Sequence, residues 1–212
     1  MLIQHIGHSE FLLTLESGFR IVTDPYDTST GYPVQEIEAD GVLVSHHHHD
    51  HDAVENISGH PQIIDYAGIH TFAPGIRATG ILSDHDDAGG SKRGKNLIFL
   101  LEAEGLRIVH LGDLGCLLDL SQLEALGDVD LLMIPVGGFY TIDAAQAMEV
   151  IHQLDPRIIL PMHYRTKYNA DWPIAPVDDF ISLFDSSSVL RGGQALRVTK
   201  EDLDCHPKVV VL

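Results

Sequence analysis

Short apolar runs rich in Val, Ile and Leu recur along the chain, and most of them end at Gly, Pro, Asp or another polar residue. Runs of this length and composition are typical of β-strands, because amphipathic helices are longer and repeat their apolar residues every three to four positions. The predicted strands are LIQHI, EFLLTLE, FRIVTDP, GVLVS, PQIID, NLIFLLEAE, LRIVHLGD, VDLLMIPV, RIILPMH, ALRVTK and VVVL.

Short polar segments that contain glycine join some of these runs. Residues 16–19 and 102–105 are short enough for hairpin turns, so the first strands and the pair around residue 105 are predicted to be antiparallel. Residues 24–33, 67–75 and 84–95 are predicted to be loops.

Helical periodicity is clearest after Asp143, which with Gln146 can cap a helix that ends before Pro156. The residues at helical spacing are Ala144, Ala147, Met148, Ile151 and Leu154. Further helices are predicted over residues 121–126 and 178–183, with a short one after residue 51.

The order of the elements, strands first and then strands alternating with helices, predicts an α/β (α+β) protein whose mixed sheets are covered by helices on their outer faces. No repeat or linker is visible, so we expect one domain, 1–212.

The charge balance narrows the choice of partners. The chain has 13 Lys and Arg against 31 Asp and Glu, a formal charge of −18. Such a chain repels phosphate backbones and anionic membranes, so we expect a small-molecule substrate, no nucleic acid and no membrane. A homo-oligomer is compatible with the sequence. Cys116 and Cys205 lack a CxxC spacing and no signal peptide is apparent, which favours a cytoplasmic location.

The segment VLVSHHHHDHDA, from Val42 to Ala53, carries five histidines. It lies inside the chain, so it is not a terminal tag, and a low-complexity metal-binding tract would need no help from elsewhere. A built metal site would need ligands on other elements. His85, Asp113 and His163 supply them, each at the end of another apolar run.

Spacing within this segment separates two sets of side chains. In an extended segment His46 and His48 can point the same way, whereas His47 and His49 point the other way. The next two residues, Asp50 and His51, lie where the chain turns and can reach a second metal.

This combination resembles the metallo-β-lactamase superfamily, and within it the small metal-dependent hydrolases related to the sugar-acid phosphate lactonases. The matching motifs are IGHSEFLL, VTDPYD, VSHHHHDH, HLGDLG, IPVGG and PMHY. The resemblance implies an αββα sandwich with a two-metal site at one edge. By motif, it places His46, His48 and His85 on one metal, Asp50, His51 and His163 on the other, and Asp113 between them.

Imidazoles with a shared carboxylate suit two divalent ions, with zinc favoured and manganese or iron as alternatives. Two such ions activate a bridging water, so the expected reaction is hydrolysis of a small ester, lactone or phosphate-bearing metabolite. Asp50 could also carry a proton to the leaving group. An iron-dependent redox enzyme of the same fold, such as a sulfur dioxygenase, and a non-enzymatic metal-binding protein are the alternatives.

Several residues near these motifs have two interpretations each. His8 either binds substrate or orients a ligand, or it is a structural histidine. Asp24 is expected to brace the histidine segment, and His110 to be structural. Tyr164 either donates a hydrogen bond to a developing oxyanion or packs in the core. Cys116 stands where relatives often have histidine, in GDLGC, which leaves the role of that position open.

The segment GGSKRGKN, residues 89–96, gathers Lys92, Arg93 and Lys95 in an acidic chain just after His85. Lys92 and Arg93 could hold an anionic group of the substrate, and the planar fork of Arg93 makes it the better candidate. A solvated connection between strands is the alternative.

Overall fold

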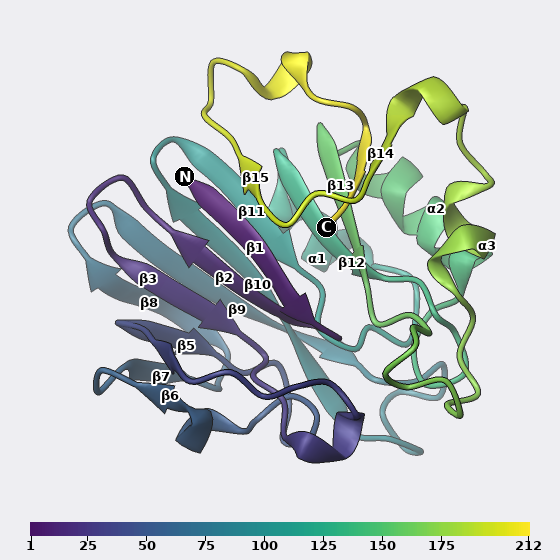
Figure 1. Cartoon of the computed structure of the whole chain (residues 1–212), viewed down its shortest axis with the longest axis horizontal. Coiled ribbons are helices and arrows are strands. Elements are labelled where there is room, and N and C mark those ends of the chain that lie inside the picture. The colour runs from purple at the N-terminus through teal and green to yellow at the C-terminus, as the bar shows by residue number, and fades with distance from the viewer.

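Two mixed sheets pack face to face in the computed structural model, which describes residues 1–212 (Figure 1). The first sheet has the order β15-β1-β2-β3-β5-β7. Its strands are β1 (Leu2–Gly7), β2 (Glu10–Thr14), β3 (Arg20–Thr23), β5 (Gly41–Leu43), β7 (Gln62–Ile64) and β15 (Leu196–Arg197). The strands from β15 to β3 are antiparallel, and β3, β5 and β7 are parallel.

The second sheet has the order β14-β16-β13-β12-β11-β10-β9-β8. Its strands are β8 (Gly68–Ala73), β9 (Ile76–Asp84), β10 (Lys95–Ala103), β11 (Leu106–His110), β12 (Leu131–Pro135), β13 (Ile158–Met162), β14 (Val189–Arg191) and β16 (Val209–Val211). Strands from β14 to β11 are parallel, and those from β11 to β8 are antiparallel. The predicted hairpins at residues 16–19 and 102–105 are therefore confirmed.

Alternation along the strands divides the apolar residues among layers. In β10, Phe99 and Leu101 join the core between the sheets, together with Phe11 and Ile21 of the first sheet. The intervening residues of β10, such as Ile98, belong instead to the core on the outer face of the second sheet. Strand β10 is thus buried on both faces, which explains its nearly continuous apolar sequence.

The three α-helices pack on the outer side of the second sheet, and the last two of them are at the right of Figure 1. They are α1 (Leu120–Leu126), α2 (Ala144–Leu154) and α3 (Val177–Ile181). As predicted, Asp143 and Gln146 form a capping box at the start of α2. None of the helices is long and apolar enough to cross a bilayer.

The outer face of the first sheet is covered differently. The short strands β4 (Ile37–Glu38) and β6 (Ile57–Ser58) pair with each other and pack over Val22 and Val42. The short helix predicted after the histidine segment is a single 3₁₀ turn, Val54–Asn56. The sandwich is confirmed, and its α-helices are concentrated on one side.

The loop predicted over residues 67–75 is wrong, because most of it is the edge strand β8. This strand pairs with β9 on one side only and leaves Ile69 exposed. An edge strand is half solvated, so its apolar residues are too sparse for the pattern that identified the buried strands.

Candidate metal centre

The predicted ligands converge at one edge of the sandwich, where β5, β9, β11 and β13 end. The histidine segment follows β5, and His85, Asp113 and His163 follow the other three strands. Metal-ligating atoms gather there in small groups. One group is His46, His48 and His85, a second is Asp50, His51 and His163 with His8, and a third is His46, His51 and Asp113.

Asp113 lies in the middle of these groups. Its Oδ2 is 3.2 Å from His85 Nε2 and 3.3 Å from His163 Nε2, and its Oδ1 is 3.2 Å from His51 Nε2. His46 Nε2 is farther away, at 4.0 Å. Donor atoms around a tetrahedral zinc ion, with bonds of ~2.0–2.1 Å, lie ~3.3 Å from one another. The three shorter separations match those of ligands that share an ion, and the 4.0 Å separation from His46 is longer.

Unsatisfied polar atoms provide the test of fit. His46 Nε2, His51 Nε2 and Asp113 Oδ1 are buried and have no hydrogen-bond partner, and all three belong to one of the ligand groups. Buried polar atoms are almost always paired, because leaving them unpaired costs free energy. A cation between them would remove that cost, so imidazole nitrogens and a carboxylate fit zinc or another divalent transition ion here.

Asp24 holds the histidine segment from behind, as the sequence predicts. Its Oδ2 accepts hydrogen bonds from His51 Nδ1 at 2.8 Å and from Ser45 Oγ at 2.6 Å, and its Oδ1 accepts from the Ser45 backbone at 2.7 Å. The bond to Nδ1 leaves His51 Nε2 free to face the other ligands. This carboxylate–histidine arrangement is the usual support of a metal ligand.

His8 contacts the second group. Its Nε2 donates to Asp50 Oδ2 at 3.2 Å, and its ring centroid is 4.3 Å from that of His163. Burial, helped by the nearby His163, lowers the pKa of His8 to about 4. A neutral His8 that orients Asp50 agrees with one of the two interpretations of this residue. His110 is structural, since its Nε2 donates to Ser9 O and its Nδ1 accepts from the Gly112 backbone.

The charges of His46 and Asp113 are those that a metal ligand requires, whereas that of His51 is not. Burial lowers the pKa of His46 to about 3, so this imidazole is neutral and able to ligate. Burial alone would raise the pKa of Asp113, but the imidazoles of His163 and His51 hold it well below its usual range. Burial likewise opposes a charge on His51, yet the carboxylates of Asp113, Asp50 and Asp24 raise its pKa well above the ordinary value. A metal that binds His51 Nε2 would therefore have to displace a proton from this imidazole.

Three residues at this edge have left-handed backbones. The φ angles are 52° at His8, 42° at Asp24 and 52° at His163. Among residues other than glycine, His, Asp and Asn enter this region most readily. Each turn directs a side chain inward just beyond the end of a strand.

A pocket of about 380 Å³ opens onto the ligands. It is lined by His48, His49, Asp50, His85, Lys92, Arg93, Asp113, Tyr140, His163 and Trp172. Tyr140 and Trp172 were not identified from the sequence. Their loops carry no metal ligand or charge cluster, and the only available signal was proximity to the motifs IPVGG and PMHY.

Other predicted residues lie away from the ligands. Tyr164 is 7% exposed and packs in the core under the helices, so the pocket is not within its reach and the oxyanion interpretation is wrong. Lys95 pairs with Asp84 at 2.5 Å and does not line the pocket, and neither does Cys116. The exposed His47 lies near Asp52, pointing away as predicted.

His49 also stays outside the ligand groups, although it borders the pocket. Its Nδ1 is 2.7 Å from Ser29 Oγ. The prediction that His47 and His49 both point away from the ligands therefore holds for His47, while His49 lies at the rim of the pocket.

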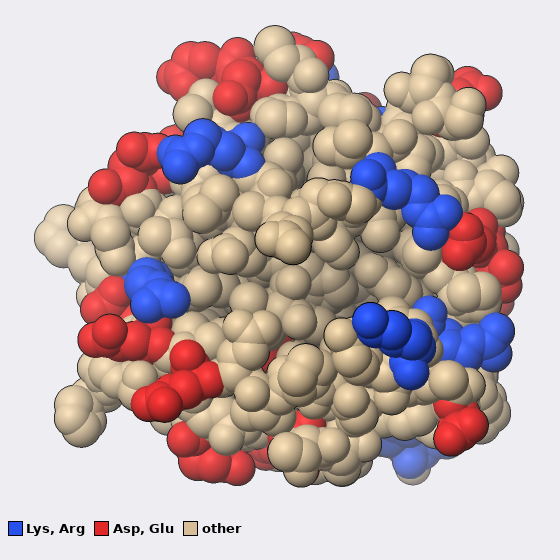
Figure 2. All heavy atoms as spheres, in the orientation of Figure 1, with Lys and Arg blue, Asp and Glu red and all other residues tan.

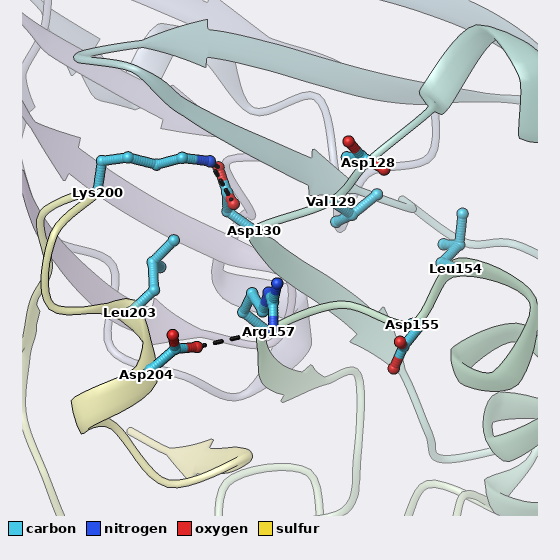
Figure 3. A pocket seen from close by; sticks show the side chains of 9 residues that line it. All are labelled: Asp128, Val129, Asp130, Leu154, Asp155, Arg157, Lys200, Leu203 and Asp204. Carbon is cyan, nitrogen blue, oxygen red and sulfur yellow. Dashed lines mark hydrogen bonds and ion pairs between the residues drawn. The ribbon is translucent and has the colours of Figure 1, made fainter.

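A second hollow, of about 420 Å³, lies at the amino ends of β12 and β13 (Figure 3). Its basic side chains already have acidic partners. Lys200 Nζ contacts both carboxylate oxygens of Asp130 at 2.7 Å, and Arg157 lies 3.7 Å from Asp204. No group of metal ligands occurs there.

The molecular surface shows how dispersed the basic residues are. On the face in Figure 2, Lys and Arg side chains lie in small separate groups around a largely uncharged centre, and Asp and Glu lie close to several of them. This face has no continuous basic surface.

Comparison with known proteins identifies the class. A family model described as β-lactamase superfamily domain matches residues 2–163. The chain is 30% identical to a UPF0173 metal-dependent hydrolase from Carboxydothermus hydrogenoformans, in an alignment covering 84% of this chain and 88% of that one. The protein thus belongs to the metallo-β-lactamase superfamily and, within it, to the UPF0173 metal-dependent hydrolases.

Solved structures agree with this placement. A Thermotoga maritima protein assigned to the Zn-dependent hydrolases of the same superfamily has 39% identity and a TM-score of 0.82, with coverage of 99% of this chain and 97% of its own. Igni18, a metallo hydrolase from Ignicoccus hospitalis, shares the fold at 22% identity with a TM-score of 0.69, over 92% and 97% of the two chains. The narrower relation to sugar-acid phosphate lactonases stays a prediction.

Proposed function

We propose that this protein hydrolyses a small ester, lactone or phosphate-bearing metabolite at a dinuclear centre, with zinc as the favoured metal. In this proposal His46, His48 and His85 hold one ion, Asp50, His51 and His163 hold the other, and Asp113 contacts both. The observation that carries it is the set of buried, unpaired atoms on His46, His51 and Asp113.

When bound, two divalent ions would supply Lewis acidity and would activate a water for hydrolysis. The residues around them have distinct tasks. Asp113 and Asp50 provide negative charge that balances the cations. Asp24 fixes the ring of His51, and His8 fixes the carboxylate of Asp50 through its 3.2 Å hydrogen bond.

Proton transfer to the leaving group is assigned to Asp50, assisted by His8. Asp50 lines the pocket, and its Oδ2 already accepts a hydrogen bond. Burial alone would raise its pKa, but His51 and His8 hold the pKa of Asp50 well below the usual range. Asp50 therefore stays ionised and accepts a proton before it donates one. Arg93, which also lines the pocket, is assigned to an anionic part of the substrate, whereas Lys92 at the same wall lies 2.7 Å from the carboxylate of Asp87.

The test combines metal analysis with turnover. Elemental analysis of purified protein should give close to two zinc ions per chain, and a screen of activated esters, lactones and phosphodiesters should reveal hydrolysis that chelation abolishes and zinc restores. Iron as the only bound metal, with no hydrolysis, would favour the redox alternative. Two bound ions without turnover of any substrate class would favour a metal-binding protein.

A further inference from the structure

Of the two basic side chains that line the pocket, only Arg93 has no acidic partner. Lys92 Nζ lies 2.7 Å from Asp87 Oδ1, so its charge is already balanced. The guanidinium of Arg93 instead lies over the ring of Tyr140, with Cζ 5.7 Å from the ring centroid. An arginine that lines a pocket and forms no ion pair with a carboxylate has its guanidinium N–H groups free to bind an anion.

The position of Arg93 is fixed by a carboxylate beneath its loop. Asp86 is 3% exposed, and its two oxygens accept four backbone N–H groups, from Ala88, Gly90, Lys92 and Arg93, at 2.8–3.0 Å. These bonds close the loop into one compact turn directly after His85. The backbone of Arg93 is therefore held relative to a predicted metal ligand.

Two aromatic rings supply the apolar part of the pocket wall. Tyr140 and Trp172 are the hydrophobic residues among those that line it, with ring centroids 6.0 Å apart and planes at 75°. The loop that carries Tyr140 is tightly constrained. Phe139 has a left-handed backbone with φ 61°, and a Cβ on Gly137 would overlap the backbone oxygen of His163. Strained backbone of this kind is often found at functional sites.

We propose that the pocket selects an organic anion with a flat apolar body. Its anionic group lies on Arg93, and its body lies against Trp172 and the exposed part of Tyr140. The volume of about 380 Å³ suits a small molecule of this kind. This inference rests on the proposed function, because the bond to be cleaved must lie between the anion site and the ligands.

Binding of two phosphonates to the metal-loaded protein tests this directly. Phenylphosphonate and methylphosphonate carry the same anionic group and no ester bond, and they differ in the flat apolar body. Trp172 is the only tryptophan of the chain, so its fluorescence reports binding at the pocket. We expect phenylphosphonate to bind at least ~10-fold more tightly than methylphosphonate, since stacking on aromatic rings adds to simple burial. Equal affinities would overturn the proposal without any variant.

Variants test the roles of Arg93 in binding the anionic group and of Tyr140 in binding the flat apolar body. Tyr140→Leu should reduce the preference for phenylphosphonate to below ~3-fold, and Arg93→Gln should weaken both probes by ~10-fold or more. Lys92→Gln, at the neighbouring cation, should change both affinities less than ~3-fold. Equal losses in Lys92→Gln and Arg93→Gln would contradict the role of Arg93. Circular dichroism and metal content confirm that each variant is folded and loaded.

Turnover by the same preparations separates this inference from the proposed function. An intact preference for phenylphosphonate, with no hydrolysis of any ester, would leave the selective pocket standing and defeat the hydrolase. Hydrolysis of aryl and alkyl substrates with equal KM, together with equal phosphonate affinities, would defeat the pocket assignment alone.

Discussion

The hollows at the two ends of the second sheet are similar in size and both are rich in charge, yet only one has the features of a reaction site. At the amino ends of the strands, Lys200 and Arg157 each contact a carboxylate, and the Arg157 and Asp204 side chains are 64% and 88% exposed. At the carboxyl ends, buried nitrogens and oxygens face one another without partners. The difference teaches that buried polar atoms without hydrogen-bond partners, rather than charge alone, mark the place where a ligand would bind.

The largest expected effect comes from comparing a buried carboxylate at each end. Asp113→Asn should lower metal content and reduce chelator-sensitive hydrolysis. Loss of a residue that only hydrogen-bonds to a metal ligand typically costs ~10–100-fold, and loss of Asp113 should cost more than that. Asp130→Asn, which replaces the carboxylate that contacts Lys200 with a neutral amide and keeps one oxygen for the Arg107 backbone, should cost ~1–3 kcal/mol of stability and leave metal content unchanged. Equal metal content in the two purified variants would contradict the assignment of the metal site to the carboxyl ends of the strands.

Removing the metal should destabilise the whole protein, because unpaired ligands crowd one edge of the sandwich. A metal present at ~1,000 times its dissociation constant stabilises the folded state by ~4 kcal/mol, which corresponds to ~8–16 °C in Tm for a chain of this size. Calorimetry before and after chelation measures the shift. An unchanged Tm in protein verified as metal-free would mean that the edge is fully formed without ions.

Asp24 offers a test one step removed from the ligands. Asp24→Asn keeps the size of the side chain but weakens the hydrogen bond to His51 Nδ1, so metal affinity should fall by ~10–100-fold. Competition with a fluorescent chelator gives the affinity. Asp204→Asn, at the exposed ion pair of the other hollow, is the matched control and should leave the affinity as it is.

Glu10 can be compared with Asp113, because both carboxyl groups are buried but Glu10 has no imidazole or cation as a partner. Burial raises its pKa to about 8, from an ordinary value of 4.5. Above pH 4.5 the unfolded chain releases this proton while the folded protein keeps it, so the contribution of Glu10 to stability falls from pH 4.5 to about 8. The stability of Glu10→Gln relative to wild type should therefore rise by ~1 kcal/mol or more between pH 6 and pH 8. Denaturant unfolding at several pH values measures this, and a difference independent of pH would contradict it.

Much of the candidate site could be predicted from sequence because metal chemistry restricts residue types. His46, His48 and Asp113 stand directly behind strand-like runs, and strand ends on one edge converge in space. Tyr140 and Trp172 could not be predicted, since they lie on loops where neither periodicity nor charge distinguishes them. For the same reason Tyr164, adjacent to a ligand in sequence, was a misleading candidate, because the residue after His163 points into the core.

Much of the fold was predictable where strands are buried on both faces or where helices have explicit caps. The β10 run and the capping box at Asp143 were clear in the sequence. The edge strand β8 was not, since half-solvated segments with glycine resemble loops. Coverage of the first sheet by β4 and β6 depends on pairing between distant segments, which local patterns do not encode.

The left-handed backbones at His8, Asp24 and His163 also limit how this centre could be redesigned for another metal. Exchanging His163 for cysteine would supply a soft sulfur donor, but cysteine has none of the tolerance for this backbone shape that histidine shows. The new ligand would begin with a conformational cost of ~1–2 kcal/mol before any bond to metal was made. The shape of the chain at this edge therefore disfavours a thiolate ligand at position 163, and a library aimed at new metal selectivity would do better to vary His48 and His85, whose backbones are not left-handed.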